Sequence, residues 1–181
     1  IVLTEDKRSD LISPILEASN FHTDEIEIWP YEGCSNINVA LALCNYIKKH
    51  SPNCKIVIHR DRDFMDEGEL NEYKEKLEND DIYVFITEGN DLESYYYNES
   101  HIMKLYNKLD IQDVRNAIND VLNDRSEKIR EKFINTIIDR KLKSGERPNS
   151  GEIANYCIQK MNEDQIKYAH GKIVLKGINA K

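Results

Sequence analysis

The chain has 181 residues, 40% of them hydrophobic and 32% charged, with a formal net charge of −8 at pH 7. This composition excludes a disordered chain and suits one globular domain, or one domain with a helical insertion. The negative balance counts against simple sequence-independent binding of nucleic acid, which depends on neutralising phosphates, but it does not exclude an acidic enzyme acting on nucleic acid. No apolar run approaches the ~20 residues that span a bilayer, and residues 1–10 lack a signal-peptide pattern. We therefore expect a cytoplasmic protein with no membrane partner.

The first half of the chain alternates between strand and helix patterns. Strands are expected at the short apolar or alternating runs, residues 1–4, 25–29, 55–59 and 82–87. Helices are expected where apolar residues recur at helical spacing, at residues 9–19, 37–47 and 67–78. Ser9 is a candidate N-cap of the first helix, Pro14 fits its first turn, and Gly33 marks a turn over residues 31–35. The alternation predicts an α/β fold with a mostly parallel sheet flanked by helices.

The second half has a different character. Residues 99–142 contain no Gly or Pro, and their apolar positions follow a helical period. The clearest break is residues 141–150, which include Gly145. A further helix is expected at residues 152–161, and the tail at residues 171–177 fits either a strand or a helix. We therefore expect a helical extension after the sheet.

Acidic side chains follow the ends of two predicted strands: Glu5 follows the first, and Asp61 and Asp63 follow the third. The carboxyl ends of parallel strands share one sheet edge, where ligands bind, and residues i and i+2 of an extended segment point the same way. A D-x-D pair alone is more often a turn or a helix cap, but three such carboxylates together repel one another unless a divalent cation neutralises them. Oxygen ligands without His or Cys favour Mg²⁺ or Mn²⁺.

The order of these elements resembles the Toprim domain, which is shared by type IA and type II topoisomerases, bacterial primases and OLD-family nucleases. Residues 2–10 resemble its strand-glutamate opening, and residues 56–64 resemble its D-x-D segment. The similarity is greatest to the OLD-family (overcoming lysogenization defect-like) endonucleases. It implies a Rossmann-like Toprim core at residues 1–98, with a helical extension and a C-terminal segment at residues 99–181 that completes the domain.

The resemblance also implies roles for individual residues. Glu5, Asp61 and Asp63 bind metal in this interpretation, and Glu5 also acts as general base. Glu93 lies in an acid-then-aromatic element and is a further metal ligand, or else an acid that interacts with a helix dipole. Lys172 lies in a Gly-Lys element of the tail and stabilises charge on the phosphate, or else is a solvated surface lysine.

Two acids depart from the family pattern. Asp6 stands where Gly usually follows the glutamate, and Asp10 lies five residues after Glu5 rather than the usual four. Asp10 therefore stays a candidate metal ligand with an open role, and the role of Asp6 is open as well.

The activity implied is that of a metal-dependent endonuclease that hydrolyses DNA phosphodiester bonds with two Mg²⁺ or Mn²⁺ ions ~4 Å apart. In the OLD-like nucleases the Toprim module follows an ABC-type ATPase domain, and the family serves in anti-phage defence. The chain begins at Ile1 without an initiator Met, which we interpret as a fragment. We therefore expect an ATPase domain in the same chain or a partner chain, and self-association through that domain is compatible with this expectation.

Two other functions fit the same residues. In a phosphoacceptor receiver domain, Glu5 and Asp6 form the opening acidic pair and Asp61 carries the phosphate, but the receiver's Lys-Pro after a fifth strand has no counterpart. The other alternative is a catalytically inactive Toprim-like module that serves an ATPase partner. The presence of Glu5, Asp61 and Asp63 favours an active site over that alternative.

Three remaining features have ordinary structural explanations. The basic stretch at residues 125–147 either follows a DNA backbone or is a solvated helix face with Glu–Lys pairs. Three adjacent tyrosines, Tyr95, Tyr96 and Tyr97, are expected to pack at the core and its rim. No metal-site spacing relates the four cysteines, so we expect free thiols at Cys34, Cys44, Cys54 and Cys157.

Overall fold

A computed structural model describes residues 1–31 and 37–180. The turn expected at Gly33 and the thiol of Cys34 lie outside these residues. The chain divides into two compact units, Ile1–Thr87 and Glu88–Lys181. This division comes earlier than the boundary expected after residue 98, because Leu92–Tyr97 packs with the C-terminal helix of the second unit.

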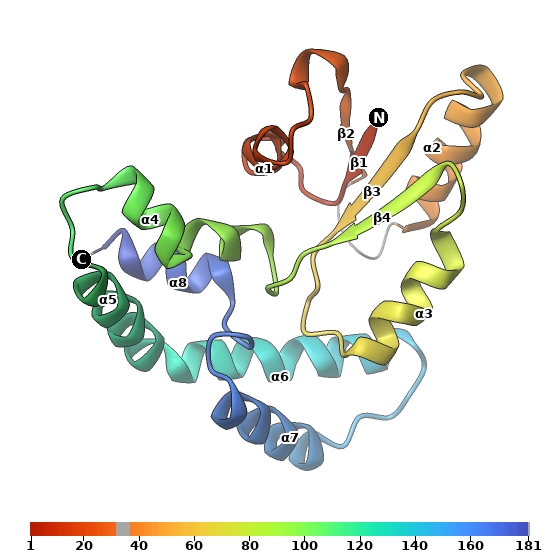
Figure 1. Ribbon diagram of the computed structural model, residues 1–181. Coiled ribbons are helices and arrows are strands. Elements are labelled where there is room, and N and C mark those ends of the chain that lie inside the picture. Colours follow the sequence, from red (N-terminus) through yellow and green to blue (C-terminus); the bar gives the residue numbers. More distant parts are fainter. Residues whose placement is uncertain (32–36, 181) are drawn as a thin grey trace. The chain divides into compact units, whose positions relative to one another are not determined.

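The first unit is built on a four-stranded sheet in which every described strand runs parallel to its neighbours (Figure 1). The strands lie in the order β2-β1-β3-β4 and comprise β1 (Val2–Thr4), β2 (Ile28–Pro30), β3 (Ile56–Arg60) and β4 (Ile82–Ile86). Three helices connect them: α1 (Ile12–Ala18), α2 (Ile37–His50) and α3 (Glu67–Leu77). The predicted α/β class with a parallel, Rossmann-like sheet flanked by helices is therefore confirmed.

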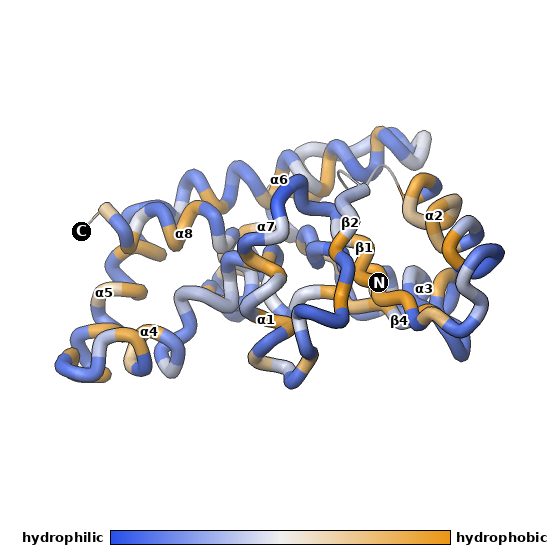
Figure 2. The backbone as a smooth tube through the Cα atoms, turned by 90° about the horizontal axis from the view of Figure 1, so that it is seen from above, coloured by the Kyte–Doolittle hydropathy of each residue, from blue (hydrophilic) through white to orange (hydrophobic). Residues whose placement is uncertain are grey.

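The core of this unit follows from the alternation of the strands. Strands β1 and β3 begin with apolar residues, seen for β1 in Figure 2, and contribute Leu3, Ile56 and Ile58, each 0% exposed. Helices α2 and α3 cover one face with side chains such as Ala40 and Leu77, while α1 lies on the other side of the sheet (Figure 1). Right-handed crossovers in this strand order send the first connection to one face and the next two to the other.

Two local predictions for this unit are wrong. Ser9 is not the N-cap of α1: the helix begins at Ile12, Leu11 occupies the cap position, and no side chain caps it. The Ser9 carbonyl instead accepts hydrogen bonds from the backbone and hydroxyl of Ser13. The second strand also begins later than its alternation suggested, because Thr23–Glu25 forms a 3-10 helix with two acids in its turn.

The second unit contains only helices among its described residues. They are the 3-10 helix η3 (Leu92–Tyr97) and the α-helices α4 (Glu99–Leu105), α5 (Ile111–Asp124), α6 (Ser126–Lys143), α7 (Ser150–Glu163) and α8 (Gly171–Ile178). The ambiguous tail is therefore helical. Helix α6 is hydrophilic along most of its length with apolar residues at intervals (Figure 2), and those residues include Ile129 and Phe133, both 0% exposed.

The break predicted around Gly145 is present: α6 ends at Lys143 and Gly145 has a φ of 81°, a conformation that favours glycine after a helix. The three described cysteines are free thiols, and burial raises the pKa of Cys44 and of Cys157 to about 11. Across residues 1–31 and 37–180, no helix is both long and apolar enough to cross a membrane.

Candidate metal centre

The strand order of the first unit reverses direction between β1 and β3. The chain passes from β1 outward to β2, then crosses back to β3 and continues to β4. In open parallel sheets, ligands bind at such a switch point, in the crevice beyond the carboxyl ends of the two strands. Here the residues in that position are Glu5 and Asp6 after β1, and Asp61 after β3.

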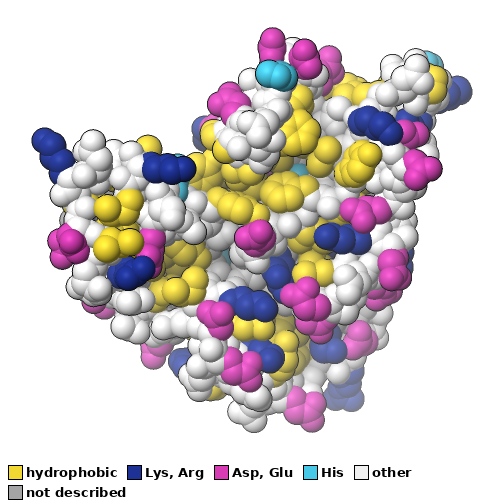
Figure 3. Space-filling model, in the orientation of Figure 1, with side chains coloured by type: hydrophobic (Ala, Val, Ile, Leu, Met, Phe, Trp, Pro, Cys, Tyr) yellow, Lys and Arg dark blue, Asp and Glu magenta, His cyan; other side chains and the backbone are white. Residues whose placement is uncertain are grey.

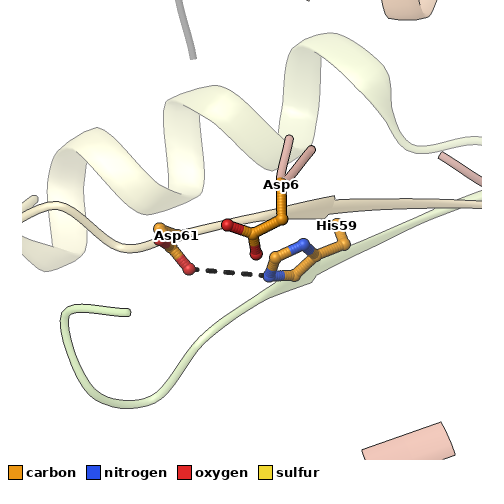
Figure 4. A group of neighbouring side chains, drawn as sticks. All are labelled: Asp6, His59 and Asp61. Atoms are coloured by element: carbon orange, nitrogen blue, oxygen red, sulfur yellow. Dashed lines mark ion pairs between the residues drawn. The ribbon is translucent and has the colours of Figure 1, made fainter. Parts of the chain in front are cut away.

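The register of the two strands brings acidic and imidazole groups together. Thr4 lies beside His59 in the β1–β3 pair, so the segments that follow leave the sheet side by side. One ligand atom from each of Asp6, His59 and Asp61 lies within 4.8 Å of the others. Figure 4 shows Asp6 from the end of β1 and Asp61 from the end of β3, with both carboxylates close to the ring of His59.

The ring of His59 is hydrogen-bonded on one side and lies near a carboxylate on the other. It is 0% exposed, its Nδ1 lies 2.9 Å from the Thr4 hydroxyl, and its Nε2 lies 3.7 Å from an oxygen of Asp61. The Thr4 hydroxyl also accepts the backbone N–H of Asp6 at 3.3 Å. Thr4 therefore positions both His59 and the backbone that carries Asp6.

Burial strongly perturbs the carboxyl group of Glu5. Burial first, and then the nearby charge of Asp63, raise its pKa from 4.5 to about 7, against the opposing effects of the Arg60 guanidinium and the backbone N–H of Asp61. One of its oxygens, Oε2, is buried without a hydrogen-bond partner. A buried carboxylate in this state is strained electrostatically, and a cation would relieve it.

Asp63 reaches this group by a route that strand geometry does not predict. Asp63 and Phe64 have φ values of 49° and 61°, so the chain turns sharply after Asp61. Asp61 and Asp63 therefore do not share one face of an extended strand. Left-handed backbone in a bulky residue such as Phe64 costs about 1–3 kcal/mol and persists where the surroundings enforce it. Here the side chain of Phe64 is 3% exposed, so its burial holds the turn that presents Asp63.

Asp10 lies apart from these acids. Its side chain is exposed and forms an ion pair with Arg8. The structure therefore brings together Asp6, His59 and Asp61, places Glu5 where the charges of Asp63 and Asp6 act on it, and leaves Asp10 at the surface.

Glu93 and Lys172 lie in the second unit, where the structure makes them neighbours. The Lys172 ammonium is 3.8 Å from a Glu93 oxygen, and the Lys172 backbone N–H donates to Asp91 at 3.0 Å. Asp91 is 2% exposed and lies 2.9 Å from Nδ1 of His170. Helix α8 lies so close to the start of η3 that a Cβ on Gly171 would lie 2.0 Å from Asp91. The two elements singled out by the resemblance thus pack against each other within this unit.

The tyrosines of η3 are packing residues within the same unit. Tyr97 is 6% exposed and packs into the helical core, and the Tyr95 hydroxyl accepts the backbone N–H of Glu88 at 3.1 Å. Burial raises the pKa of both phenols. These groups are held as neutral phenols, which is the opposite of what an activated tyrosine nucleophile requires.

Sequence reasoning missed His59 and undervalued Asp6. The sequence-based group held oxygen donors alone, whereas the structure adds an imidazole at its centre. A signal was present, because His59 stands two residues before Asp61 and strand alternation places the two side chains on one face. Comparisons of the chain with protein-family models, with curated proteins and with solved structures found no match.

The donor set suits a divalent cation. It combines the carboxylates of Asp6 and Asp61 with one buried imidazole, and the neighbouring Glu5 has a buried oxygen with no hydrogen-bond partner. Like charges packed this closely are costly without a cation. The first unit therefore has a candidate metal centre at its switch point.

Proposed function

We propose that this chain is the catalytic part of a metal-dependent endonuclease of the Toprim type, which hydrolyses DNA phosphodiester bonds. The observation that carries the proposal is the group of Asp6, His59 and Asp61 at the switch point of a parallel sheet, with Glu5 near enough for the charges of Asp6 and Asp63 to raise its pKa. Carboxylate clusters at such a position serve to hold the cations that phosphoryl chemistry requires.

The acids of the first unit have different roles in this proposal. Asp61 and Asp63 bind Mg²⁺ or Mn²⁺, and bound ions supply charge neutralisation at the phosphate and a more acidic water. Glu5 both binds metal and accepts the proton of the attacking water. The family resemblance implies that Glu93 is a further metal ligand and that Lys172 stabilises charge on the phosphate; both residues lie in the second unit, where they neighbour each other.

The basic residues of α6 supply little of the DNA-binding surface. Lys141 pairs with Glu146 at 2.7 Å, and Arg130 lies 4.0 Å from Glu127. On the face shown in Figure 3, basic and acidic side chains are interspersed rather than separated into regions of one sign. We therefore assign DNA binding largely to an ABC-type ATPase domain in the same chain or a partner chain, within a cytoplasmic anti-phage defence system. That role rests on the family resemblance.

The receiver-like alternative has less support. It needs a lysine after a fifth strand, and the described residues form four strands, with the tail folded as helix α8. The inactive Toprim-like alternative is compatible with the same acids, and only an activity measurement separates it from the proposal.

The test is plasmid cleavage with Mg²⁺ or Mn²⁺, comparing wild type with Asp61→Asn, in this chain and in the intact protein. Removal of an outer partner of a metal ligand already reduces activity about 10–100-fold, so we expect loss of this ligand to reduce cleavage by more than about 100-fold. Asp10→Asn is the matched control, because Asp10 is an exposed acid outside the group, and it should cleave as wild type does. Metal-independent cleavage, or none by any wild-type form, overturns the proposal, and an acid-labile phosphate on Asp61 would favour the receiver.

A further inference from the structure

We propose that the metal centre of the first unit takes a first-row transition ion such as Mn²⁺ in preference to Mg²⁺, because His59 supplies a nitrogen ligand beside Asp6 and Asp61. The inference rests on the metal site of the proposed function, but it does not require that the site cleaves DNA. It names a ligand that neither the acidic spacing nor the family resemblance includes.

The geometry supports a mixed nitrogen and oxygen site. Atoms of Asp6, His59 and Asp61 able to bind an ion lie within 4.8 Å of one another, and Figure 4 shows the imidazole directed between the two carboxylates. Ligands about 2.0–2.3 Å from one ion lie roughly 3–4 Å apart from each other. The 3.7 Å separation between His59 Nε2 and Asp61 falls in that range.

Thr4 prepares the histidine for this role. The hydroxyl of Thr4 lies 2.9 Å from Nδ1, and it accepts a hydrogen bond from the Nδ1–H in the tautomer whose Nε2 carries the free lone pair. Metal-bound histidines are usually held in this way, with the second ring nitrogen donating to a neighbouring oxygen that fixes the tautomer. Since His59 is 0% exposed, its Nε2 faces the carboxylates of Asp6 and Asp61 rather than solvent.

The nitrogen donor determines which ion is preferred. Mg²⁺ demands oxygen ligands in near-ideal octahedral geometry and gives up its waters reluctantly. Imidazole suits transition ions, and the affinity of a mixed site rises along the first-row series. A group of carboxylates alone would favour Mg²⁺ as readily as Mn²⁺, so the preference depends on His59.

The first test is direct binding of Mn²⁺ to the wild-type chain near neutral pH, followed by pulsed electron paramagnetic resonance. We expect bound Mn²⁺ to show modulation from an imidazole nitrogen. This measurement needs no variant, so it decides the question even if substitutions at His59 prevent folding. Bound Mn²⁺ without nitrogen modulation would overturn the proposal.

The second test compares Mn²⁺ and Mg²⁺ affinities by calorimetry in His59→Gln, with folding checked by circular dichroism. We expect Mn²⁺ affinity to fall about tenfold or more while Mg²⁺ affinity changes less than about threefold. His22→Gln is the matched control, because His22 is an exposed histidine of the same unit, and it should keep both the affinity and the nitrogen signal. Equal losses for the two ions in His59→Gln would overturn the selectivity.

The two proposals fail in different ways. Mn²⁺ bound through His59 without DNA cleavage removes the nuclease function and leaves the mixed site standing. Metal-dependent cleavage with equal use of Mg²⁺ and Mn²⁺, and without an imidazole signal, removes the mixed site and leaves the nuclease.

Discussion

The raised pKa of Glu5 makes a prediction about stability that is independent of activity. In the metal-free protein, Glu5 holds its proton up to about pH 7, whereas the unfolded chain releases it near 4.5. The folded state therefore binds more protons between these values, and the stability that this group contributes is fully present below 4.5 and lost as the pH rises through about 7. The neutral isostere in Glu5→Gln avoids that loss.

The magnitude follows from the two pKa values. One pKa unit corresponds to about 1.4 kcal/mol, so the difference between 4.5 and about 7 amounts to about 3 kcal/mol. We expect Glu5→Gln to be more stable than wild type by up to about 3 kcal/mol at pH values above 8, and equal to it below 4.5. The glutamine oxygen still accepts the backbone N–H of Asp61, so that hydrogen bond is retained.

The assay is urea unfolding of both proteins with a chelator present, across the pH range. Asp10→Asn serves as control, and its difference from wild type should not depend on pH in the same way, because Asp10 is exposed. Mn²⁺ at 100 times its Kd should then largely remove the difference, since it stabilises the wild-type folded state by about 2.7 kcal/mol and Glu5→Gln lacks the carboxylate charge next to the ion. A Glu5→Gln protein less stable than wild type at alkaline pH without metal would refute the reasoning.

Two further predictions concern the second unit, and both are measured by thermal unfolding. Gly171→Ala should destabilise it by about 1–3 kcal/mol or more, because the new Cβ would lie 2.0 Å from Asp91; Gly151→Ala, whose Cβ meets nothing closer than 3.6 Å, should be neutral or stabilising, and equal effects would contradict this account. Asn90→Ala should cost about 1–3 kcal/mol, because its buried amide donates to two backbone carbonyls at 3.0 and 2.8 Å. Asn116 is exposed, so Asn116→Ala should change the free energy of unfolding by less than about 0.5 kcal/mol. A similar loss in both variants would show that the hydrogen bonds of Asn90 do not stabilise the unit.

The parallel sheet could be predicted because its cause is local. The strands of the first unit are short and largely apolar, and each connection carries an α-helix, so alternation along the chain sets the class of fold. The end of the third strand could be predicted for the same reason, since the apolar run 56–58 passes directly into charged residues. The acids Glu5 and Asp61 then follow as strand-end residues at one edge.

Other features depend on contacts between residues that are far apart in the sequence. The left-handed turn at Asp63 and Phe64 depends on burial of the phenyl ring, and spacing alone predicted a straight continuation. The tail at residues 171–177 is apolar enough for a strand, and it is helical because Val174 and Gly177 pack against the helical core. Ser9 looked like a cap by residue type, but its hydroxyl caps nothing in α1 because the helix begins three residues later.

The pairing of strands decides which acids share a site with the imidazole. Thr4 lies beside His59 in the register of β1 and β3, and alternation then places Asp6 with Thr4, and Asp61 with His59, on one face of the two strand ends. Glu5, one residue before Asp6, has the opposite parity along the strand, and the charges of Asp63 and Arg60 act on it most strongly. A slip of one residue would exchange these sets and bring Glu5 rather than Asp6 to the histidine. The chemistry of the centre therefore follows from the register of two short strands, because the D-x-D spacing specifies carboxylates and only the register adds the nitrogen.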